Sequence, residues 1–514
     1  MKNLYAYFYS FTLFLFLSIS VQAQLKKISL DDDWKFHLGH AANAEKDFNY
    51  SLQNVFVKSG VAKGTAISTQ FNDSSWATVQ IPHDWAVDLP FVNVDNFDVA
   101  SHGYKPVGGL FPETSIGWYR KRFQLNIADS GKKIELQFDG IYRNADVWVN
   151  GFYAGKNASG YVGANFNVTD FVNFSSENII VVRVDATQYE GWFYEGAGIY
   201  RHTWLNIYPS THIINDGLFA YSQLADNKAT VFVETAIFKE DDLNYSVWTE
   251  LIDRKGKVVA KSPIQPIKQA NATNNQLTVK HSLIVNNPIL WDLDNPYLYR
   301  LKVYIEKNKS IIDVRTLRFG IRKMEVKANG FFLNGKLVKI KGTNNHQDHA
   351  GLGVALPDYL QYYRISLLKN MGSNAYRASH HAPTPELLDA CDSLGMLVMS
   401  EQRLLNSGEE YMNQLERLIK RDRSRACIFM WSIGNEEGAI QANDFGKRIA
   451  TTLIKKVQSL DPTRTCTYAA DLPNVFKGVN EVIPVRGFNY RQFAVADYHK
   501  EHPEQPIIGT EMGS

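Results

Sequence analysis

The sequence is poor in cysteine: its 514 residues contain only Cys391, Cys427 and Cys466. All three lie in the last quarter of the chain in apolar surroundings, and an odd number without paired spacing does not form a disulfide framework. This excludes the small disulfide-stapled class of secreted domain. We expect three buried free thiols.

The chain also lacks an excess of charge of either sign, because 55 Lys and Arg stand against 53 Asp and Glu, for a net charge of +2. No field that attracts polyanions follows, so nucleic acid is not an expected partner. Apolar residues make up 45% and charged residues 21% of the chain, which excludes a disordered chain or a coiled-coil rod. At roughly 150 residues per domain, three or four domains are expected.

Long apolar runs are missing except near the N-terminus. There Lys2 precedes the run from Phe11 to Leu17, and Val21–Ala23 has the small-x-small pattern of a cleavage site. This pattern predicts a signal peptide over residues 1–23 and an exported protein, periplasmic or secreted. The alternative is an N-terminal membrane anchor, for which the run is short, and no cysteine lies near the cleavage site to carry a lipid.

Aromatic residues are abundant at 13%, with 10 Trp and 26 Tyr, a supply that suits both β-sheets and sugar-binding clefts. Over residues 24–209 the pattern is β, and no dinucleotide-binding glycine pattern occurs. Ile134, Leu136 and Phe138 alternate onto one face of a strand, and Asn150-Gly151 predicts a two-residue hairpin. Turn residues about every ten positions predict a sandwich or jelly roll.

A second all-β segment covers residues 210–319. Its clearest strands are 230–235, 245–252 and 301–305. A length of roughly 110 residues suits a seven-strand immunoglobulin-like sandwich. The segment has no cysteine for the inter-sheet disulfide of antibody domains.

From residue 320 to 514, short β runs alternate with amphipathic helices, which predicts a parallel sheet. A doubly wound sheet is the alternative, but polar residues at the C-terminal ends of successive strands favour a (β/α)₈ barrel. Seven strands are predicted, at 337–342, 373–378, 396–401, 427–433, 464–468, 485–490 and 506–511, with helices at 357–370, 385–394 and 442–459.

Two carboxylates directly follow apolar strands: Glu436 at the end of the fourth barrel strand and Glu511 at the end of the seventh. Strands four and seven face each other across a barrel. Two carboxyl groups about 5–5.5 Å apart on either side of a sugar ring make a retaining glycosidase, with one as nucleophile and the other as acid/base. A single Glu in such a place is more often an ion-pair or capping residue, but the pair favours catalysis.

The chain resembles glycoside hydrolase family 2, the family of β-galactosidases, β-glucuronidases and β-mannosidases. The matching segments are Ile81–Trp85, Gly117–Arg120, Gly196–Arg201, Asn295–Tyr299, Phe319–Arg322 and, most specifically, Trp431–Glu436. The resemblance implies that Glu436 is the acid/base, that Asn435 binds the sugar 2-hydroxyl and that Glu511 is the nucleophile. It further implies substrate contacts for His346, His380 and Arg377, and a bond from Tyr490 to the nucleophile.

Other polar residues near this site have plainer explanations. His346, Asp348 and His349 could form a metal cluster or only a polar loop, and zinc is not expected because glycoside hydrolysis needs no Lewis acid. His381 is expected beside the site rather than in it. No cofactor is predicted, and the ligands of the magnesium site in related β-galactosidases have no clear counterpart in residues 402–408.

The chain departs from the family pattern in several places. Ser400-Glu401 stands where many relatives have Asp-Glu, and residues 422–426 lack the usual Asn-His-Pro. The sequence stops at Ser514, so the eighth barrel strand is missing, and we expect an incomplete copy of a longer enzyme. An aromatic sugar platform on that strand, common in the family, is missing with it.

The leading hypothesis is a retaining exo-β-glycosidase that hydrolyses terminal β-linked sugars of oligo- or polysaccharides, as a β-galactosidase. Gly434 and His380 favour galactosidases over the β-glucuronidase and β-mannosidase alternatives. A non-catalytic carbohydrate-binding protein is the alternative from another class, and a cell-surface adhesion protein is third, since adhesion does not explain the paired glutamates. The sequence does not determine the oligomeric state.

Overall fold

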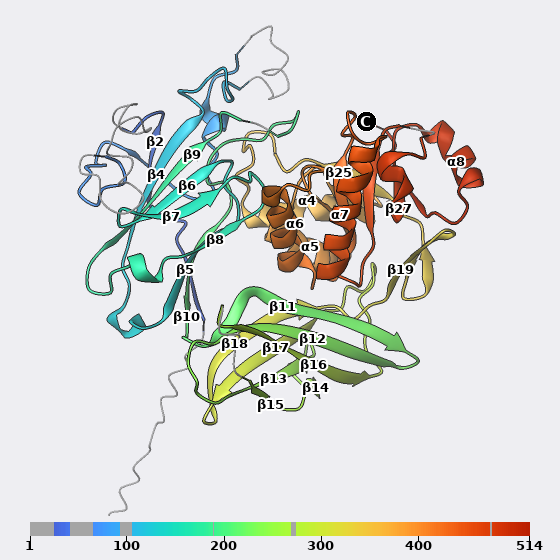
Figure 1. Cartoon of the computed structure of the whole chain (residues 1–514), viewed down its shortest axis with the longest axis horizontal. Helices are drawn as coiled ribbons and strands as arrows, with labels where there is room; N and C mark the ends of the chain where they lie inside the picture. Colours follow the sequence, from blue (N-terminus) through green and yellow to red (C-terminus); the bar gives the residue numbers. More distant parts are fainter. Residues whose placement is uncertain are drawn as a thin grey trace, which may run out of the picture.

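We analysed a computed structural model, which describes residues 25–41, 65–92, 105–188, 190–268, 274–472 and 475–513. The expected signal peptide, residues 1–23, lies outside the described residues. Three bodies meet side by side: an all-β domain in blue and cyan, a sandwich in green and yellow, and an α/β domain in orange and red (Figure 1).

The first domain is two antiparallel sheets packed face to face, as the jelly-roll prediction requires. One sheet has the order β3-β2-β4-β9-β6-β7 and the other β1-β10-β5-β8. The strands are β1 (Lys26–Ser29), β2 (Trp34–Leu38), β3 (Ala77–Val79), β4 (Ile116–Phe123), β5 (Lys133–Phe138), β6 (Ala145–Val149), β7 (Phe152–Asn157), β8 (Ala164–Asn167), β9 (Asn178–Asp185) and β10 (Thr203–Tyr208), with the short 3₁₀ helices η1 (Trp85–Asp88), η2 (Ile127–Asp129) and η3 (Thr169–Phe171).

Local predictions in this domain are confirmed. Ile134, Leu136 and Phe138 on β5 are fully buried on one face. Asn150 and Gly151 join β6 to β7 with φ of 52° and 85°, the left-handed pair that a tight hairpin turn needs.

The second domain is the predicted sandwich, with the sheet β11-β12-β16 against the sheet β14-β13-β17-β18 and β15 paired to β13. It has eight strands rather than seven, because the edge partner of β13 is interrupted at Pro263, which has no N–H to donate. The strands are β11 (His212–Ala225), β12 (Lys228–Phe238), β13 (Tyr245–Ile252), β14 (Val258–Lys261), β15 (Gln265–Ile267), β16 (Gln276–Asn286), β17 (Tyr299–Lys307) and β18 (Ser310–Phe319).

The third domain contains seven parallel strands in the sequential order of a barrel, β22 to β28, and no doubly wound reversal of order. They are β22 (Gly342–Asn345), β23 (Ala375–Ala378), β24 (Leu397–Glu401), β25 (Ile428–Asn435), β26 (Cys466–Ala470), β27 (Val485–Asn489) and β28 (Ile507–Glu511). Among the described residues β22 and β28 each pair with one neighbour only, so they form the two edges.

The first predicted barrel strand, 337–342, is wrong. Leu337 and Val338 belong to β21 (Lys336–Val338), which forms a small antiparallel sheet with β19 (Met324–Lys327) and β20 (Gly330–Leu333). Parallel pairing begins only at Gly342, opposite Ala375. An apolar pair such as Leu337-Val338 fits a parallel or an antiparallel sheet. Its nearest pairing partner in the sequence is β20, with which it forms an antiparallel hairpin.

The helices on the barrel are α4 (Asp358–Asn370), α5 (Pro385–Leu394), α6 (Glu409–Asp422), α7 (Asp444–Leu460) and α8 (Val495–Glu501), with η4 (Gly478–Glu481) and η5 (Gln492–Ala494). Three match the predicted helices closely, whereas α6 and α8 were not predicted. The apolar spacing of Met412, Leu415, Leu418 and Ile419 on α6 is nevertheless that of an amphipathic helix.

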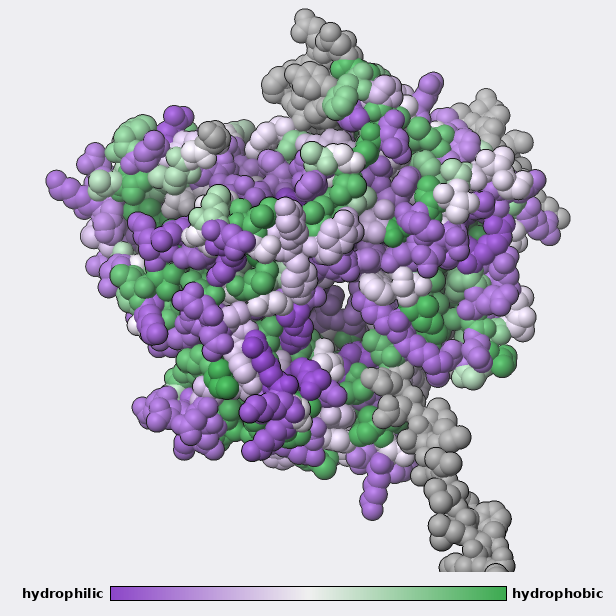
Figure 2. All heavy atoms as spheres, turned by 180° about the vertical axis from the view of Figure 1, so that it is seen from behind, coloured by the Kyte–Doolittle hydropathy of each residue, from purple (hydrophilic) through white to green (hydrophobic). Residues whose placement is uncertain are grey.

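Buried apolar side chains of the first domain and the barrel form one continuous core, while the sandwich has a core of its own. The three cysteines are buried and free, as predicted. Among the described residues no helix is long and apolar enough to cross a bilayer. From behind, the surface mixes hydrophilic and hydrophobic residues around a central recess (Figure 2).

Candidate active site

The C-terminal ends of the barrel strands bring together the polar residues that the sequence singled out. Glu436 follows β25 and Glu511 ends β28, and both line one cavity of about 1300 Å³. Arg377, His380 and Tyr490 line the same cavity. Parallel strands place their carboxyl ends on the same rim, which is why residues far apart in sequence meet here.

Glu511 is held at both carboxylate oxygens. Arg377 Nη1 donates to Oε1 at 2.7 Å, and the Tyr490 hydroxyl donates to Oε2 at 2.9 Å. His380 Nε2 lies 3.6 Å from Oε1. A carboxylate so fixed, beside a guanidinium, has a defined orientation toward the cavity and its negative charge is stabilised.

Arg377 is buried at the centre of this network and donates hydrogen bonds to more than one residue. Its Nε and Nη2 donate to Glu401 Oε2 at 2.9 and 2.6 Å, and Nη2 also donates to Asn435 Oδ1 at 2.9 Å. Burial alone would raise the pKa of Glu401, but the charge of Arg377 and hydrogen bonds from His380 and Ser432 outweigh it and hold that pKa at about 2. Glu401 is therefore the permanent counter-ion that keeps the guanidinium in place.

Glu436 has a different environment. Burial raises its pKa, the negative charge of Glu511 raises it further, and a hydrogen bond from Asn489 Nδ2 at 2.8 Å opposes the shift. Its backbone φ is 55°, a left-handed conformation that is unusual away from glycine and is found at functional sites. The two carboxyl groups thus differ: Glu511 is fixed by a cation, and Glu436 has a raised pKa.

Asn435 lies between the two glutamates. Its Oδ1 accepts hydrogen bonds from Arg377 and from Asn489 Nδ2, the latter at 2.9 Å. Among the described residues no partner is present for its buried Nδ2. That N–H group is therefore available as a donor to a bound ligand.

Histidines and aromatic rings form another part of the site. His346 Nδ1 lies 3.0 Å from the carbonyl of Ser379, its ring stacks on Phe193 at 4.3 Å, and burial lowers its pKa. Trp192, 51% exposed, lies 5.3 Å from the ring of His380 and lines the cavity. Trp192 and Phe193 come from the loop between β9 and β10, so the first domain contributes to the site.

The remaining histidines lie apart from this network. His381 stacks on Tyr161 at 4.9 Å and lines a separate, smaller cavity. Within the described ranges, His346, Asp348 and His349 do not gather into a group of metal-ligating atoms.

The sequence missed three contributors. Glu401 was noted only as a departure from the family pattern, although it anchors Arg377. Asn489 was quoted beside Tyr490 but given no role, yet it bonds both Asn435 and Glu436. Trp192 lies outside the barrel, and only its high exposure next to a buried Phe193 marks it.

Comparison with known proteins assigns the architecture. The family models "Glycosyl hydrolases family 2, sugar binding domain", "Glycosyl hydrolases family 2" and "Glycosyl hydrolases family 2, TIM barrel domain" match residues 28–209, 211–322 and 324–408 with 405–514. The chain belongs to glycoside hydrolase family 2. The family resemblance drawn from Trp431–Glu436 and the other segments is confirmed.

Named relatives within family 2 include more than one activity. A β-galactosidase of Bacteroides ovatus is 32% identical over 94% of this chain and 58% of its own length. A putative β-glucuronidase of Formosa agariphila is 32% identical over 72% of this chain and 44% of its own length. A family 2 structure from Bacteroides cellulosilyticus superimposes with a TM-score of 0.83 at 31% identity, covering 94% of this chain and 61% of that one. The family 2 chain described here thus spans about three fifths of the length of these relatives or less.

Proposed function

We propose that this chain acts as a retaining exo-β-glycosidase that hydrolyses terminal β-linked galactose. The observation that carries the proposal is the contrast between the two glutamates in one cavity. Glu511 is held by Arg377 Nη1 and by the Tyr490 hydroxyl, whereas burial and the nearby Glu511 raise the pKa of Glu436. A nucleophile and a general acid need those two environments.

The reaction proceeds in two displacements. Glu511 attacks the anomeric carbon while Glu436 gives its proton to the leaving oxygen, so the glycosidic bond breaks and a glycosyl ester forms on Glu511. Loss of the proton leaves Glu436 as the base. It then takes a proton from water, the water oxygen attacks the anomeric carbon, and the ester bond to Glu511 breaks.

Neighbouring residues position the sugar ring. The unpartnered Asn435 Nδ2 is the donor for the 2-hydroxyl, a bond that gains strength as charge develops on the ring. His346 and His380 flank the ring. The exposed face of Trp192 offers an apolar platform to the sugar.

The cations around the cavity favour a neutral sugar. Arg377 is occupied by Glu401, Glu511 and Asn435. The other cations that line the cavity are Lys327, Lys339 and Lys341, all of which precede β22 and lie toward the opposite end of the strands from the glutamates. A uronic acid would need a cation for its carboxylate, and among the described residues that line the cavity none is free beside the glutamates, which supports the choice of a galactoside over a glucuronide.

A substrate panel tests the proposal. The chain should hydrolyse an aryl β-galactoside faster than the matching β-glucuronide and β-mannoside, and NMR should show the β-anomer as the first product. A first product of α configuration would contradict the retaining mechanism. Sugar binding without turnover of any of the three substrates would support the non-catalytic alternative instead.

A further inference from the structure

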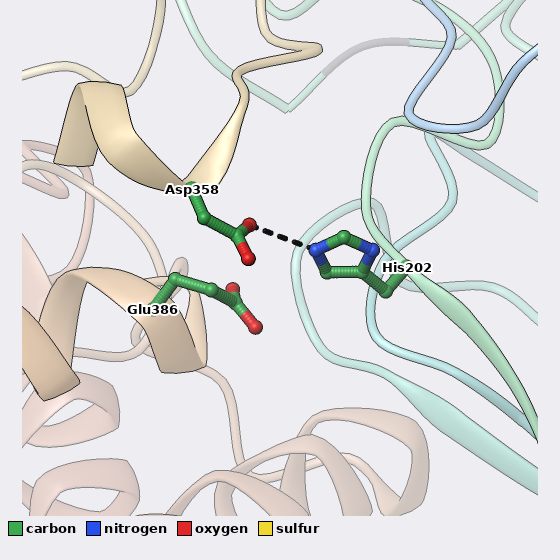
Figure 3. Close-up of side chains that lie close together, drawn as sticks. All are labelled: His202, Asp358 and Glu386. Atoms are coloured by element: carbon green, nitrogen blue, oxygen red, sulfur yellow. Dashed lines mark hydrogen bonds and ion pairs between the residues drawn. The ribbon is translucent and has the colours of Figure 1, made fainter. Parts of the chain in front are cut away.

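A second cluster of chemically active side chains lies away from the catalytic cavity, where the first domain meets the barrel. His202 directly precedes β10, Asp358 opens α4 and Glu386 lies in the first turn of α5. Their side chains point toward one another across the domain boundary (Figure 3). Among the described residues this is the one group of three whose ligand atoms all lie within 4.8 Å of one another.

The spacing of these atoms suits one small cation. His202 Nε2 lies 2.8 Å from Asp358 Oδ1. Ligand atoms that bind a common metal at about 2.0–2.2 Å are separated from each other by roughly 3–4 Å. A small shift of the Glu386 carboxylate would bring its oxygen to that separation from the other two ligand atoms. Both carboxylates lie at helix N-termini, where the helix dipole favours their charged form.

The histidine is already oriented as metal-bound imidazoles are. Its other nitrogen, Nδ1, is 2.7 Å from Asp31 Oδ2. A carboxylate behind the ring fixes the ring's orientation and makes the facing nitrogen a better ligand. The facing nitrogen, Nε2, points at Asp358 Oδ1, so both atoms lie where they would bind one cation.

A separate observation is a small cavity beside the cluster, lined by a buried polar atom without a partner in the described part of the chain. A small cavity of about 20 Å³ is lined by His202, Asp358 and Glu386 and also by Gln361. That volume holds about one water molecule or ion. Gln361 is 6% exposed, and its Oε1 has no hydrogen-bond partner among the described residues. Gln361 is one turn along α4 from Asp358, on the same face of the helix.

The charge balance around the cavity is also consistent with a cation. Asp31, Asp358 and Glu386 place three carboxylates around one imidazole. Arg201 also lines the cavity, but its guanidinium donates to the carbonyls of Tyr161 and Ala382 and to Gln347 Oε1. Its hydrogen bonds therefore go to neutral oxygens and not to the cluster.

We propose that His202, Asp358 and Glu386 bind a divalent zinc-class cation that joins the first domain to the barrel. Gln361 supplies a fourth oxygen, directly or through the single water that the cavity holds. One nitrogen and several oxygen donors suit Zn²⁺ better than Ca²⁺, which prefers oxygen ligands alone. The ion is structural, because the cluster is separate from the cavity of Glu436 and Glu511.

Zinc titration of the chelator-treated full chain tests the site. Calorimetry should show one Zn²⁺ per chain, and Glu386→Gln and Asp358→Asn should each weaken that binding at least tenfold. Glu409→Gln is the matched control, since Glu409 is an exposed carboxylate in the first turn of α6 outside the cluster. It should leave the affinity unchanged.

The melting temperature tests whether the bound ion stabilises the interface between the first domain and the barrel. Zn²⁺ should raise the melting temperature of the parent chain and of Glu409→Gln, and should leave that of Glu386→Gln unchanged. Anomalous scattering from a zinc-soaked crystal should place the ion between His202 and Glu386. Absence of stoichiometric binding, or binding that neither Glu386→Gln nor Asp358→Asn weakens, would overturn the proposal.

Discussion

The two glutamates of the cavity lie on strands of very different character. Glu436 follows β25, whose eight residues are all buried and which pairs with β24 and β26. Glu511 ends β28, which pairs only with β27 among the described residues and whose Ile507 and Ile508 are half-buried. Glu436 is thus positioned by strand packing, whereas Glu511 depends on Arg377 from β23 and on Tyr490, which directly follows β27.

The largest expected effect comes from removing either carboxyl group. Glu436→Ala should lower kcat by about 10²–10⁴-fold, the usual contribution of a general acid/base, and Glu511→Ala should lose at least as much. Added azide should restore turnover of an activated aryl galactoside in both variants. It should yield the β-glycosyl azide with Glu436→Ala and the α-glycosyl azide with Glu511→Ala, because only the former still forms the covalent intermediate.

Glu437→Gln is the control for that experiment. Glu437 is next in the chain, but its Oε1 accepts from the Leu405 amide, and burial raises its pKa to about 7. The variant should keep the activity of the parent chain and need no azide. The same azide anomer from both alanine variants would contradict the assignment of separate roles.

The next prediction uses two variants of Arg377 to distinguish its positioning of Glu511 from its contribution to the stability of the fold. Arg377→Met leaves Glu401 buried without its guanidinium partner, with only the hydrogen bonds from His380 and Ser432, so it should destabilise the barrel by about 3–5 kcal/mol and abolish most of the activity. Arg377→Met combined with Glu401→Met should recover most of the stability and none of the activity. Urea unfolding and turnover of an aryl galactoside measure the two effects, and recovery of activity in the double variant would show that Arg377 does not position Glu511.

A smaller effect is expected when the packing of β25 and of β28 is compared by alanine substitution. Ile433→Ala on β25 removes a fully buried side chain and should cost about 2–5 kcal/mol of unfolding free energy. Ile508→Ala on β28 removes a half-buried one and should cost clearly less. The midpoints of the barrel's urea transition give both values, and equal losses would mean that β28 is packed as firmly as β25.

The smallest expected effect is a shift of the pH profile. The hydrogen bond from Asn489 lowers the pKa of Glu436, so Asn489→Ala should raise it. Activity falls as Glu436 loses its proton, so the alkaline limb of kcat/KM should move to higher pH. Asn344→Ala, whose side chain contacts Arg377 at 3.4 Å, is the control that should leave the limb in place. A shift of the limb to lower pH with Asn489→Ala would contradict the account of Glu436.

The sequence predicts the parts of this molecule that depend on local patterns. The sequence shows these patterns directly. They are the alternation in Lys133–Phe138, the turn residues Asn150-Gly151, and the apolar runs before Glu436 and Glu511. The three-domain architecture follows from such segments. Leu337-Val338 was misplaced because two apolar residues do not distinguish a hairpin from a parallel strand.

The parts that the sequence does not predict are contacts between distant segments. Ser400-Glu401 shows a carboxylate after a strand but not that Arg377, one strand away, bonds it. Trp192 belongs to another domain. The sandwich domain separates His202 from Asp358 in the sequence, and α4 and β23 separate Asp358 from Glu386. Such groups appear only when the fold brings their side chains together.

The most direct test of the central claim is to trap the intermediate. Incubation with an activated 2-deoxy-2-fluoro-β-galactoside should inactivate the chain, and mass spectrometry of the digested protein should find the sugar on Glu511. Glu436→Ala should still be labelled, and Glu511→Ala should not. A label on Glu436, or on any other residue, would contradict the account of Glu511 as the fixed nucleophile.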